Sequence, residues 1–291
     1  GCLITMRPFI KNTVNEVKFT YVAQEYKSPK KEKSKKVKKI ETAKKSENIE
    51  EYDNTISLNA ATTINLFEDL DYDLKSIRDG QKVKPIYLTK LPKDLNSLGN
   101  TKIKRELFIK IVLPLILDEN EKITEDRKKL FKILSKNFNT AGERVWLKRR
   151  FKEYKIEDQD LAKLKMRMDI VPVSIAIAQA ANESGWGTSR FALEGNALFG
   201  QWTWSKKGIS PKKKDKNQTH KVLQFQILKA SVRAYKNNLN THNAYRDFRE
   251  ARAQMREEGQ VKGLELTKYL KNYASIGEKY VSILDSIIVK N

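Results

Sequence analysis

Apolar residues recur at every fourth position in one segment of the chain, at Ile103, Leu107, Ile111 and Leu115. This spacing predicts an amphipathic helix that bends or ends near Pro114, because proline lacks the N–H that a helix interior uses. Apolar faces at helical spacing predict three more helices, over residues 118–135, 140–154 and 158–168. Thr140 precedes Glu143 by three residues, which is the spacing of a capping box at the start of the second of these.

An almost wholly apolar run follows Pro172 and stops before Gly185 and Gly187. Proline suits the first position of a helix, and a helix that is apolar on all sides is buried in the middle of a domain. We therefore expect a central helix from Val173 to about Ser184. The rest of the chain predicts a short helix over residues 188–193, a hairpin of residues 198–204 with 221–227, and helices from residue 229 onward.

Polar residues dominate the first hundred positions. The block from Lys27 to Lys45 has ten lysines against Glu32 and Glu41, so we expect it to stay solvated, either as a tether to an acidic surface or as a passive linker. Residues 46–100 are expected to be irregular. The predicted organisation is a largely irregular N-terminal extension, residues 1–100, and a domain of residues 101–291, divided into a helical part (101–168) and a core (169–291). The predicted fold class is α+β and predominantly helical.

The composition of the 291 residues limits the classes of binding partner that we expect. The formal net charge of +22 favours nucleic acid, anionic lipid or acidic envelope polymers. No aromatic RNA-binding signature or zinc-ligand spacing accompanies this charge, so we expect no nucleic-acid partner. His220 and His242 are far apart and have no cysteine nearby, so the sequence predicts no metal and no other cofactor.

The single cysteine, Cys2, follows Gly1 at the start of the sequence. One interpretation is the lipid-bearing cysteine of a bacterial lipoprotein whose signal peptide has been removed. The other is an ordinary cysteine behind a glycine left by an expression tag. The first interpretation predicts a membrane anchor.

Glu183 is the main candidate for chemistry. It lies three residues after Ala180 and seven after Ala176, so it projects from the alanine-rich face of the central helix. Burial and the negative end of the helix dipole both raise the pKa of a carboxyl group there. A carboxylic acid that keeps its proton near neutral pH suits protonation of a glycosidic oxygen. The alternative is a buried glutamate paired with a lysine or arginine for structure.

Aromatic and amide residues cluster after Glu183 in the sequence. Aromatic faces stack on sugar rings, and amides bind sugar hydroxyl and acetamide groups. The predicted substrate-binding residues are Trp186, Asn196, Phe199, Trp202 and Trp204.

Several motifs resemble those of one known family. Residues 183–189 (ESGWGTS) and 196–200 (NALFG) resemble the signature of the bacterial glucosaminidases, glycoside hydrolase family 73. Residues 231–242, 266–270 and 273–277 are similar to the Bax-like branch of that family. The resemblance covers about residues 101–288 and leaves out the first hundred.

The resemblance implies a lysozyme-like fold with a helical lobe and a small β-hairpin lobe across a groove. It implies an endo-β-N-acetylglucosaminidase that binds peptidoglycan glycan strands and hydrolyses them at N-acetylglucosamine, with Glu183 as general acid. Tyr273 matches a tyrosine of the family's active site, which would orient the acetamide or the water. The alternative for Tyr273 is a core residue. The implied location is the bacterial cell envelope, periplasmic or anchored through a lipidated N-terminus.

The second catalytic group is less well indicated. Asp215 is the only acid within residues 198–227, and its lysine neighbours would keep it ionised, as a base requires. Glu194 is the other local candidate. Residues 225–231 lack the acid that relatives often carry there, so we favour assistance by the sugar's own 2-acetamido group, which predicts retention of anomeric configuration. A base that activates water across a wider gap would give inversion.

Two other functions fit the same sequence. A lytic transglycosylase would use one glutamate and leave an anhydro sugar. A non-catalytic envelope protein would bind peptidoglycan without cutting it, with the lysine block on an anionic envelope surface.

Overall fold

The computed structural model describes residues 58–203, 208–210 and 221–291. The predictions for Cys2, the Lys27 to Lys45 block, Trp204 and Asp215 lie outside these residues. Within them, no helix is long and apolar enough to cross a bilayer.

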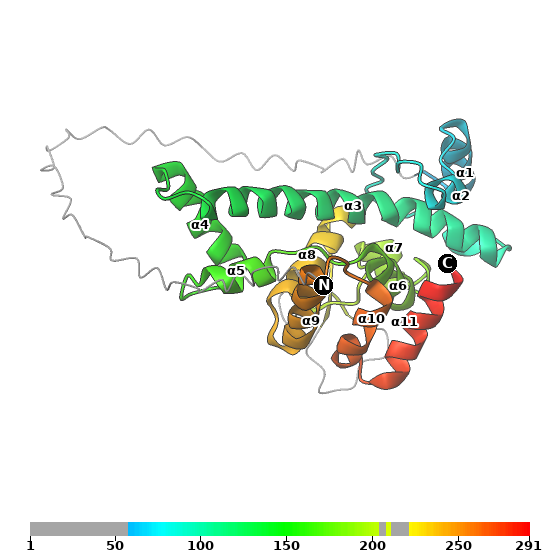
Figure 1. Cartoon of the computed structure of the whole chain (residues 1–291). Coiled ribbons are helices and arrows are strands. Elements are labelled where there is room, and N and C mark those ends of the chain that lie inside the picture. Colours follow the sequence, from blue (N-terminus) through cyan, green and yellow to red (C-terminus); the bar gives the residue numbers. More distant parts are fainter. Residues whose placement is uncertain (1–57, 204–207, 211–220) are drawn as a thin grey trace, which may run out of the picture. The chain divides into compact units, whose positions relative to one another are not determined.

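The described chain is mainly helical (Figure 1). The helices are α1 (Ala60–Asp69), α2 (Leu74–Arg78), α3 (Thr101–Leu134), α4 (Ala141–Glu153), α5 (Leu161–Arg167), α6 (Val173–Ser184), α7 (Arg190–Gly195), α8 (Leu228–Thr241), α9 (Arg246–Glu257), α10 (Gly263–Leu266) and α11 (Glu278–Lys290). The 3-10 turns are η1 (Leu95–Ser97), η2 (Asn243–Tyr245) and η3 (Thr267–Tyr273).

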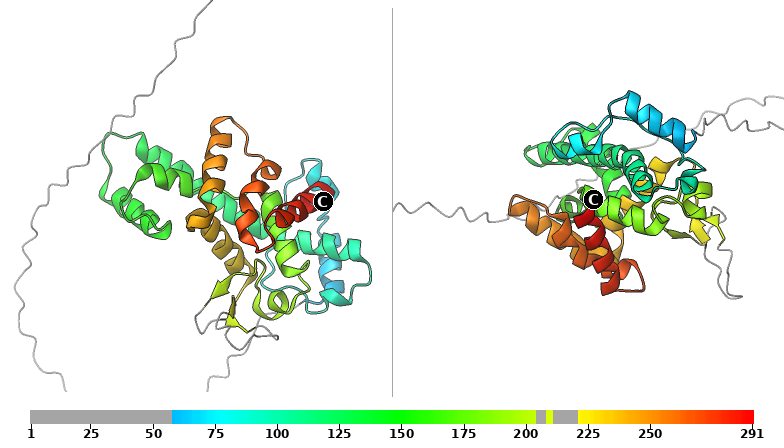
Figure 2. Two further views of the ribbon diagram at one scale, coloured as in Figure 1. Left: turned by 90° about the horizontal axis from the view of Figure 1, so that it is seen from below. Right: turned by 90° about the vertical axis from the view of Figure 1, so that its right-hand side faces the viewer.

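A small antiparallel sheet completes the described fold. Its strands are β1 (Trp202–Thr203), β2 (Gly208–Ile209) and β3 (Lys221–Leu223), in the order β1-β3-β2. Figure 2 shows its short arrows at one edge of the helices. The predicted pairing of residues 198–204 with 221–227 is confirmed, with Trp202 opposite Val222. The strands are shorter than expected, and β2 was not predicted because only two of its residues pair. The predominantly helical α+β class is confirmed, whereas the lysozyme-like groove stays a prediction.

Helix α6 has the predicted bounds and lies in the centre of the main core. It contacts α3, α10 and α11. Ile175, Ala176, Ala178, Ala180 and Ala181 are fully buried. Small alanine side chains allow neighbouring helices to approach closely, so a rigid helix carries Glu183 at its last turn.

Helix α3 differs from the prediction, because it continues through Pro114 to Leu134. Proline removes one hydrogen bond from a helix interior, which costs about 3 kcal/mol in an exposed helix. Here Pro114 lies inside a run of buried residues that includes Ile111, Val112, Leu115 and Ile116. Burial of these side chains on both sides of the proline holds the two halves in one helix.

Residues 60–78 also differ from the prediction of irregular structure, because they form α1 and α2. The Asn59 side chain accepts a hydrogen bond from the backbone of Thr62 and caps α1. Phe67 and Leu91 are buried in the same core as Phe108 of α3. The division of the chain at residue 100 stays a prediction, and side chains before that residue contribute to the main core.

A second, smaller core lies under the end of α3. It contains Leu130, Phe151, Tyr154, Leu164 and Met168 from α3, α4, α5 and the residues after α4 and α5. The predicted capping box at Thr140 and Glu143 is confirmed at the start of α4. Helix α5 begins at Leu161 instead of residue 158, because Asp160 caps it.

The buried carboxylate of Asp169 lies in the segment between α5 and α6 and connects that segment to α3 and α9. Arg256 donates to its two oxygens at 2.7 and 2.6 Å from Nε and Nη2. Arg127 of α3 and Arg252 of α9 each place a nitrogen 3.8 Å from Asp169 Oδ2. Asp169 is 2% exposed and Arg252 is not exposed at all, so this is a desolvated charge cluster.

Candidate active site

Glu183 lies on the last turn of α6, directly before a loop of unusual backbone shape. Gly185 ends the helix in the left-handed region, with φ +58°. The Ser184 hydroxyl is buried and accepts a hydrogen bond from the backbone N–H of Gly187 at 2.8 Å. The Trp186 N–H donates to the carbonyl of Ala181 at 2.7 Å. These bonds make the end of α6 a defined support for the carboxyl group.

The Glu183 carboxyl is half-buried and held by neutral groups. Burial raises its pKa above the usual value, and hydrogen bonds from the Tyr280 hydroxyl and the Asn182 amide oppose that rise. Asn182 Nδ2 donates to Oε1 at 3.2 Å. Gly200 approaches from the other side with φ +58°, and a Cβ there would lie 3.1 Å from Oε2. Among the described residues no lysine or arginine forms an ion pair with Glu183, so the purely structural ion pair is not found there.

A chain of buried hydrogen bonds orients the tyrosine that contacts Glu183. The Tyr235 hydroxyl donates to Gln179 Oε1 at 2.7 Å, which leaves Gln179 Nε2 to donate to the Tyr280 hydroxyl at 2.9 Å. Because the Tyr280 oxygen accepts from that amide, its own proton is free to point at Glu183. Gln179, Tyr235 and Tyr280 are all fully buried.

Tyr273 belongs to an aromatic group beside this chain of hydrogen bonds. Its ring stacks on Tyr280 with centroids 5.7 Å apart and an angle of 5° between the planes. Its hydroxyl donates to the carbonyl of Phe199 at 2.9 Å. The Phe199 ring is 1% exposed and stacks on Tyr235 at 3.8 Å. In this arrangement Phe199 offers no open face to a sugar, so its predicted substrate contact, like that of Tyr273, stays a prediction.

Trp186 packs against helix α3. Its ring meets Phe108 edge-on at 5.9 Å, and the guanidinium of Arg105 lies 4.9 Å from its centroid. The next residue, Gly187, has φ +79°, and a Cβ there would come 2.8 Å from Phe108 Cδ2. The glycine therefore permits the close approach of this loop to α3. Trp186 remains half-exposed, and its role in binding substrate stays a prediction.

Asn196 is buried and connects two loops near the sheet. Its Nδ2 donates to the carbonyls of Phe225 and Gln226, both at 3.0 Å. Its backbone is left-handed, with φ +51°, at the end of α7. These contacts support the loop that carries Phe199 and Gly200, and a contact with sugar stays a prediction.

For the remaining predicted site residues, the structure shows fewer contacts. Trp202 lies in β1, opposite Val222 of β3. Glu194 is exposed on α7 and pairs with Arg190 at 3.2 Å. Within the described ranges, no group of His, Cys, Asp and Glu is arranged to hold a metal ion.

Sequence reasoning gave no role to Gln179, Tyr235 or Tyr280 in holding Glu183. Gln179 lies four residues before Glu183, so both side chains project from one face of α6. It is also the only polar residue between Ile175 and Ala181. A lone amide on an apolar helix face, one turn before the candidate acid, is the signal that would have identified it.

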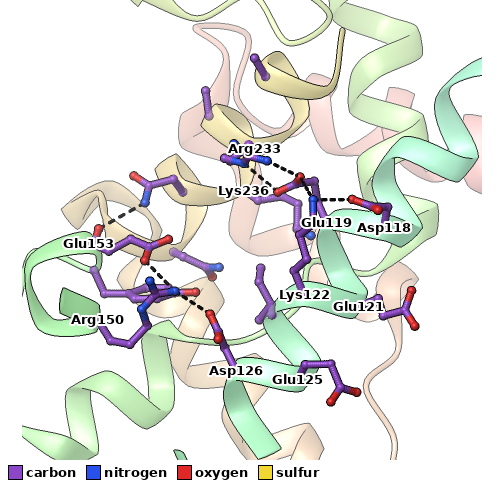
Figure 3. Close-up of a pocket in the computed structure, with 16 residues that line it drawn as sticks. Asp118, Glu119, Glu121, Lys122, Glu125, Asp126, Arg150, Glu153, Arg233 and Lys236 are labelled. Atoms are coloured by element: carbon purple, nitrogen blue, oxygen red, sulfur yellow. Dashed lines mark hydrogen bonds and ion pairs between the residues drawn. The ribbon is translucent and has the colours of Figure 1, made fainter. Parts of the chain in front are cut away.

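A polar pocket of about 980 Å³ lies elsewhere, between α3, α4 and α8 (Figure 3). Glu119 accepts from Arg233 Nη2 at 2.9 Å and from Nε at 3.1 Å, and Asp126 accepts from Arg150 at 2.6 Å. None of the predicted site residues lines this pocket. These ion pairs cross the walls of the pocket and form a network that joins the three helices.

Lys236, beside this network, is expected to make stability depend on pH. It is 2% exposed, and its Nζ has no hydrogen-bond partner among the described residues. Burial lowers its pKa to about 7, although the nearby Glu119 and Asp118 charges oppose the shift. The unfolded chain therefore binds more protons than the folded one above pH 7, and stability rises with pH until about 10.5.

The expected slope from this group is up to about 1.4 kcal/mol per pH unit. Lys236→Met should flatten it, which urea unfolding at pH 7 and pH 9 would measure. The exposed Lys152→Met is the matched control and should keep the wild-type slope. An unchanged slope in Lys236→Met would contradict the assignment.

Two comparisons with known proteins bear on this site. A family model described as glucosaminidase, mannosyl-glycoprotein endo-beta-N-acetylglucosaminidase, matches residues 159–291. The protein bax of Escherichia coli (strain K12) is 34% identical over 208 residues, which is 68% of this chain and 73% of that protein. No solved structure matches the chain. The matches agree with the motifs around Glu183 and along α8, and the chain belongs to the Bax-like branch of the glucosaminidase family.

Proposed function

We propose that the protein is a peptidoglycan hydrolase that cleaves glycan strands at N-acetylglucosamine, with Glu183 as the general acid. The observation that carries this proposal is the half-buried Glu183 carboxyl, whose pKa is raised by burial and whose hydrogen-bond partners among the described residues, Tyr280 and Asn182, are neutral. Membership of the glucosaminidase family supports a glycosidase with a glycan substrate. The same membership supports a location in the cell envelope, which we propose for this chain.

The proposed first step is proton transfer from Glu183 to the oxygen of the scissile bond. Tyr280 and Asn182 hold the carboxyl so that its proton can point toward the leaving oxygen. As the C–O bond breaks, Glu183 becomes a carboxylate, which the same two donors stabilise. Charge-assisted hydrogen bonds are stronger than neutral ones, so these contacts strengthen during the step.

The proposed nucleophile is the carbonyl oxygen of the sugar's own 2-acetamido group. Glu194, an alternative base, is exposed and paired with Arg190, so it has neither the burial nor the isolation of Glu183. We expect the product to keep the anomeric configuration of the substrate, which proton NMR of the first turnovers would reveal. Net inversion would rule out assistance by the acetamide and favour a base such as Asp215.

The activity itself is tested on purified peptidoglycan sacculi. Soluble glycan fragments should be released by the wild-type chain, and the release should fall at alkaline pH as Glu183 loses its proton. Binding to sacculi without release at any pH would overturn the proposed enzyme and favour a peptidoglycan-binding protein.

Tyr280→Phe is expected to shift the pH dependence of that activity. The hydroxyl of Tyr280 lowers the pKa of Glu183, so its removal should raise that pKa further. The alkaline limb of the kcat/KM profile should then move to higher pH, together with about 1 kcal/mol of lost stability from the missing hydrogen bond. The control is Tyr269→Phe, whose hydroxyl makes no hydrogen bond among the described residues. A limb that stays in place, or that moves to lower pH, would contradict the role given to Tyr280.

A further inference from the structure

The turn between α3 and α4 forms a strongly basic end of the fold. Between Arg127 and Lys152 the sequence has ten lysine and arginine residues and one acid, Glu143. Eight of the ten are exposed: Lys128, Lys129, Lys132, Lys136, Arg144, Lys148, Arg149 and Lys152. Glu143 is itself neutralised by Lys136 at 2.5 Å. We call residues 127–152 the basic hairpin.

Several of these cations have no counter-charge. Lys132, Lys148, Arg149 and Lys152 form no ion pair within the described part of the chain. Like charges held close together repel one another, so the basic hairpin favours a partner that brings a dense array of negative charge.

Apolar side chains are exposed at the same turn. Phe138, in the connection between the helices, is 89% exposed. Phe131 and Leu134 on the last turns of α3, and Val145 on α4, are 41%, 39% and 52% exposed. The smaller core beneath is complete without them, since it contains Leu130, Phe151 and Leu164. These four side chains are not among the buried residues of that core and leave apolar surface beside the lysines.

We propose that the basic hairpin docks on an anionic lipid bilayer, with Phe138 entering the headgroup region. Exposed cations in the same turn as an exposed aromatic residue combine the two attractions that hold a protein at such a surface: charge, and burial of apolar area at the acyl boundary. Long lysine side chains can reach headgroups while their stems cover the apolar residues. A soluble polyanion would use the charge but would give no reason for the exposed Phe138. The docking surface is separate from Glu183 and does not depend on the proposed function.

Co-sedimentation of the full chain with lipid vesicles tests the surface. Vesicles of phosphatidylcholine with added phosphatidylglycerol should bind the wild type. The triple variant Lys132→Glu, Lys148→Glu and Arg149→Glu should bind at least about tenfold more weakly, since each substitution replaces an attraction to the anionic headgroups with a repulsion. Reversing three exposed lysines elsewhere, Lys82, Lys279 and Lys290, is the matched control for net charge. Equal losses in both triple variants would overturn a specific surface.

Phe138→Ser separates a bilayer from a soluble polyanion. It should weaken vesicle binding by about tenfold and leave binding to polyphosphate unchanged, because only the bilayer buries the ring. Val289→Ser, at another exposed apolar position, should change neither. If Phe138→Ser binds vesicles like the wild type, the proposal fails and the basic hairpin binds by charge alone.

A local probe makes the test independent of lysines elsewhere in the chain. A polarity-sensitive dye on Asn137→Cys, in a Cys2→Ser background, should shift its emission to shorter wavelength with anionic vesicles. It should not shift with pure phosphatidylcholine vesicles or polyphosphate. The same dye on Lys82→Cys is the control and should not shift. Vesicle binding without a shift at position 137 would show that another part of the chain makes the contact, and would overturn the proposal.

Discussion

Glu183→Gln is expected to lower kcat/KM on peptidoglycan by about 10²- to 10⁴-fold, the usual contribution of a positioned general acid. Glutamine has the shape of the carboxyl and still accepts a hydrogen bond from Tyr280, but it has no acidic proton to give to the leaving oxygen. Burial raises the pKa of the Glu183 carboxyl and so already disfavours its charged form. Replacing the carboxyl with a neutral amide of the same shape should therefore leave the melting temperature near that of the wild type. The rate of glycan release from sacculi and thermal unfolding together measure both expectations.

The matched control is Glu194→Gln, eleven residues away on α7. This carboxylate is exposed and pairs with Arg190, so its removal should change activity by less than about twofold and stability by less than about 1 kcal/mol. If Glu183→Gln kept most of the activity, or if Glu194→Gln lost as much, the acid would have to be assigned elsewhere.

Asp169→Asn should be the most destabilising of these substitutions. Among the described residues, it would leave the fully buried Arg252 without a counter-charge, and it would remove the carboxylate with which the half-buried Arg256 pairs. Breaking a buried ion pair from one side typically costs 3–5 kcal/mol, so we expect a loss of about 4 kcal/mol. For a unit of this size, that loss lowers the melting temperature by on the order of 10 °C.

Urea unfolding measures this loss, with Glu250→Gln as its control. Glu250 pairs with Arg246 at 2.7 Å on the exposed side of α9, where the same kind of contact contributes less than about 1 kcal/mol. Asp169→Asn with stability within 1 kcal/mol of the wild type would show that the buried cluster contributes little. Activity should follow the folded fraction, because Asp169 does not touch Glu183.

The sequence predicted best those elements whose signals are local. Helix α6 has the predicted bounds because Pro172 and Gly185 mark its two ends and the run between them is apolar. Thr140 and Glu143 were correctly predicted to start α4, since a capping box involves only residues three apart. The predicted bend or end of the helix near Pro114 was wrong, because α3 continues through this residue. Whether a proline interrupts a helix depends on packing between segments that are distant in the sequence, and a local pattern does not contain that information.

The same distinction between local and long-range signals applies to the candidate site. Glu183 was identified from its position on an apolar face and from its motif. Trp186 lies against Phe108, a contact between residues far apart in the sequence. The hydrogen bonds from Tyr235 through Gln179 to Tyr280 cross between three helices, and their partners become evident only when those helices pack together. Sequence spacing therefore identified Glu183, the proposed acid, but not the groups that hold its carboxyl.

The most direct test of the proposed function is mass spectrometry of the fragments released from sacculi, after reduction with borohydride. Hydrolysis at N-acetylglucosamine should give fragments that end in reduced N-acetylglucosamine, and Glu183→Gln should give almost none of them. Fragments that end in anhydromuramic acid would contradict hydrolysis and make the protein a lytic transglycosylase. Reduced muramic acid ends would contradict the proposed bond.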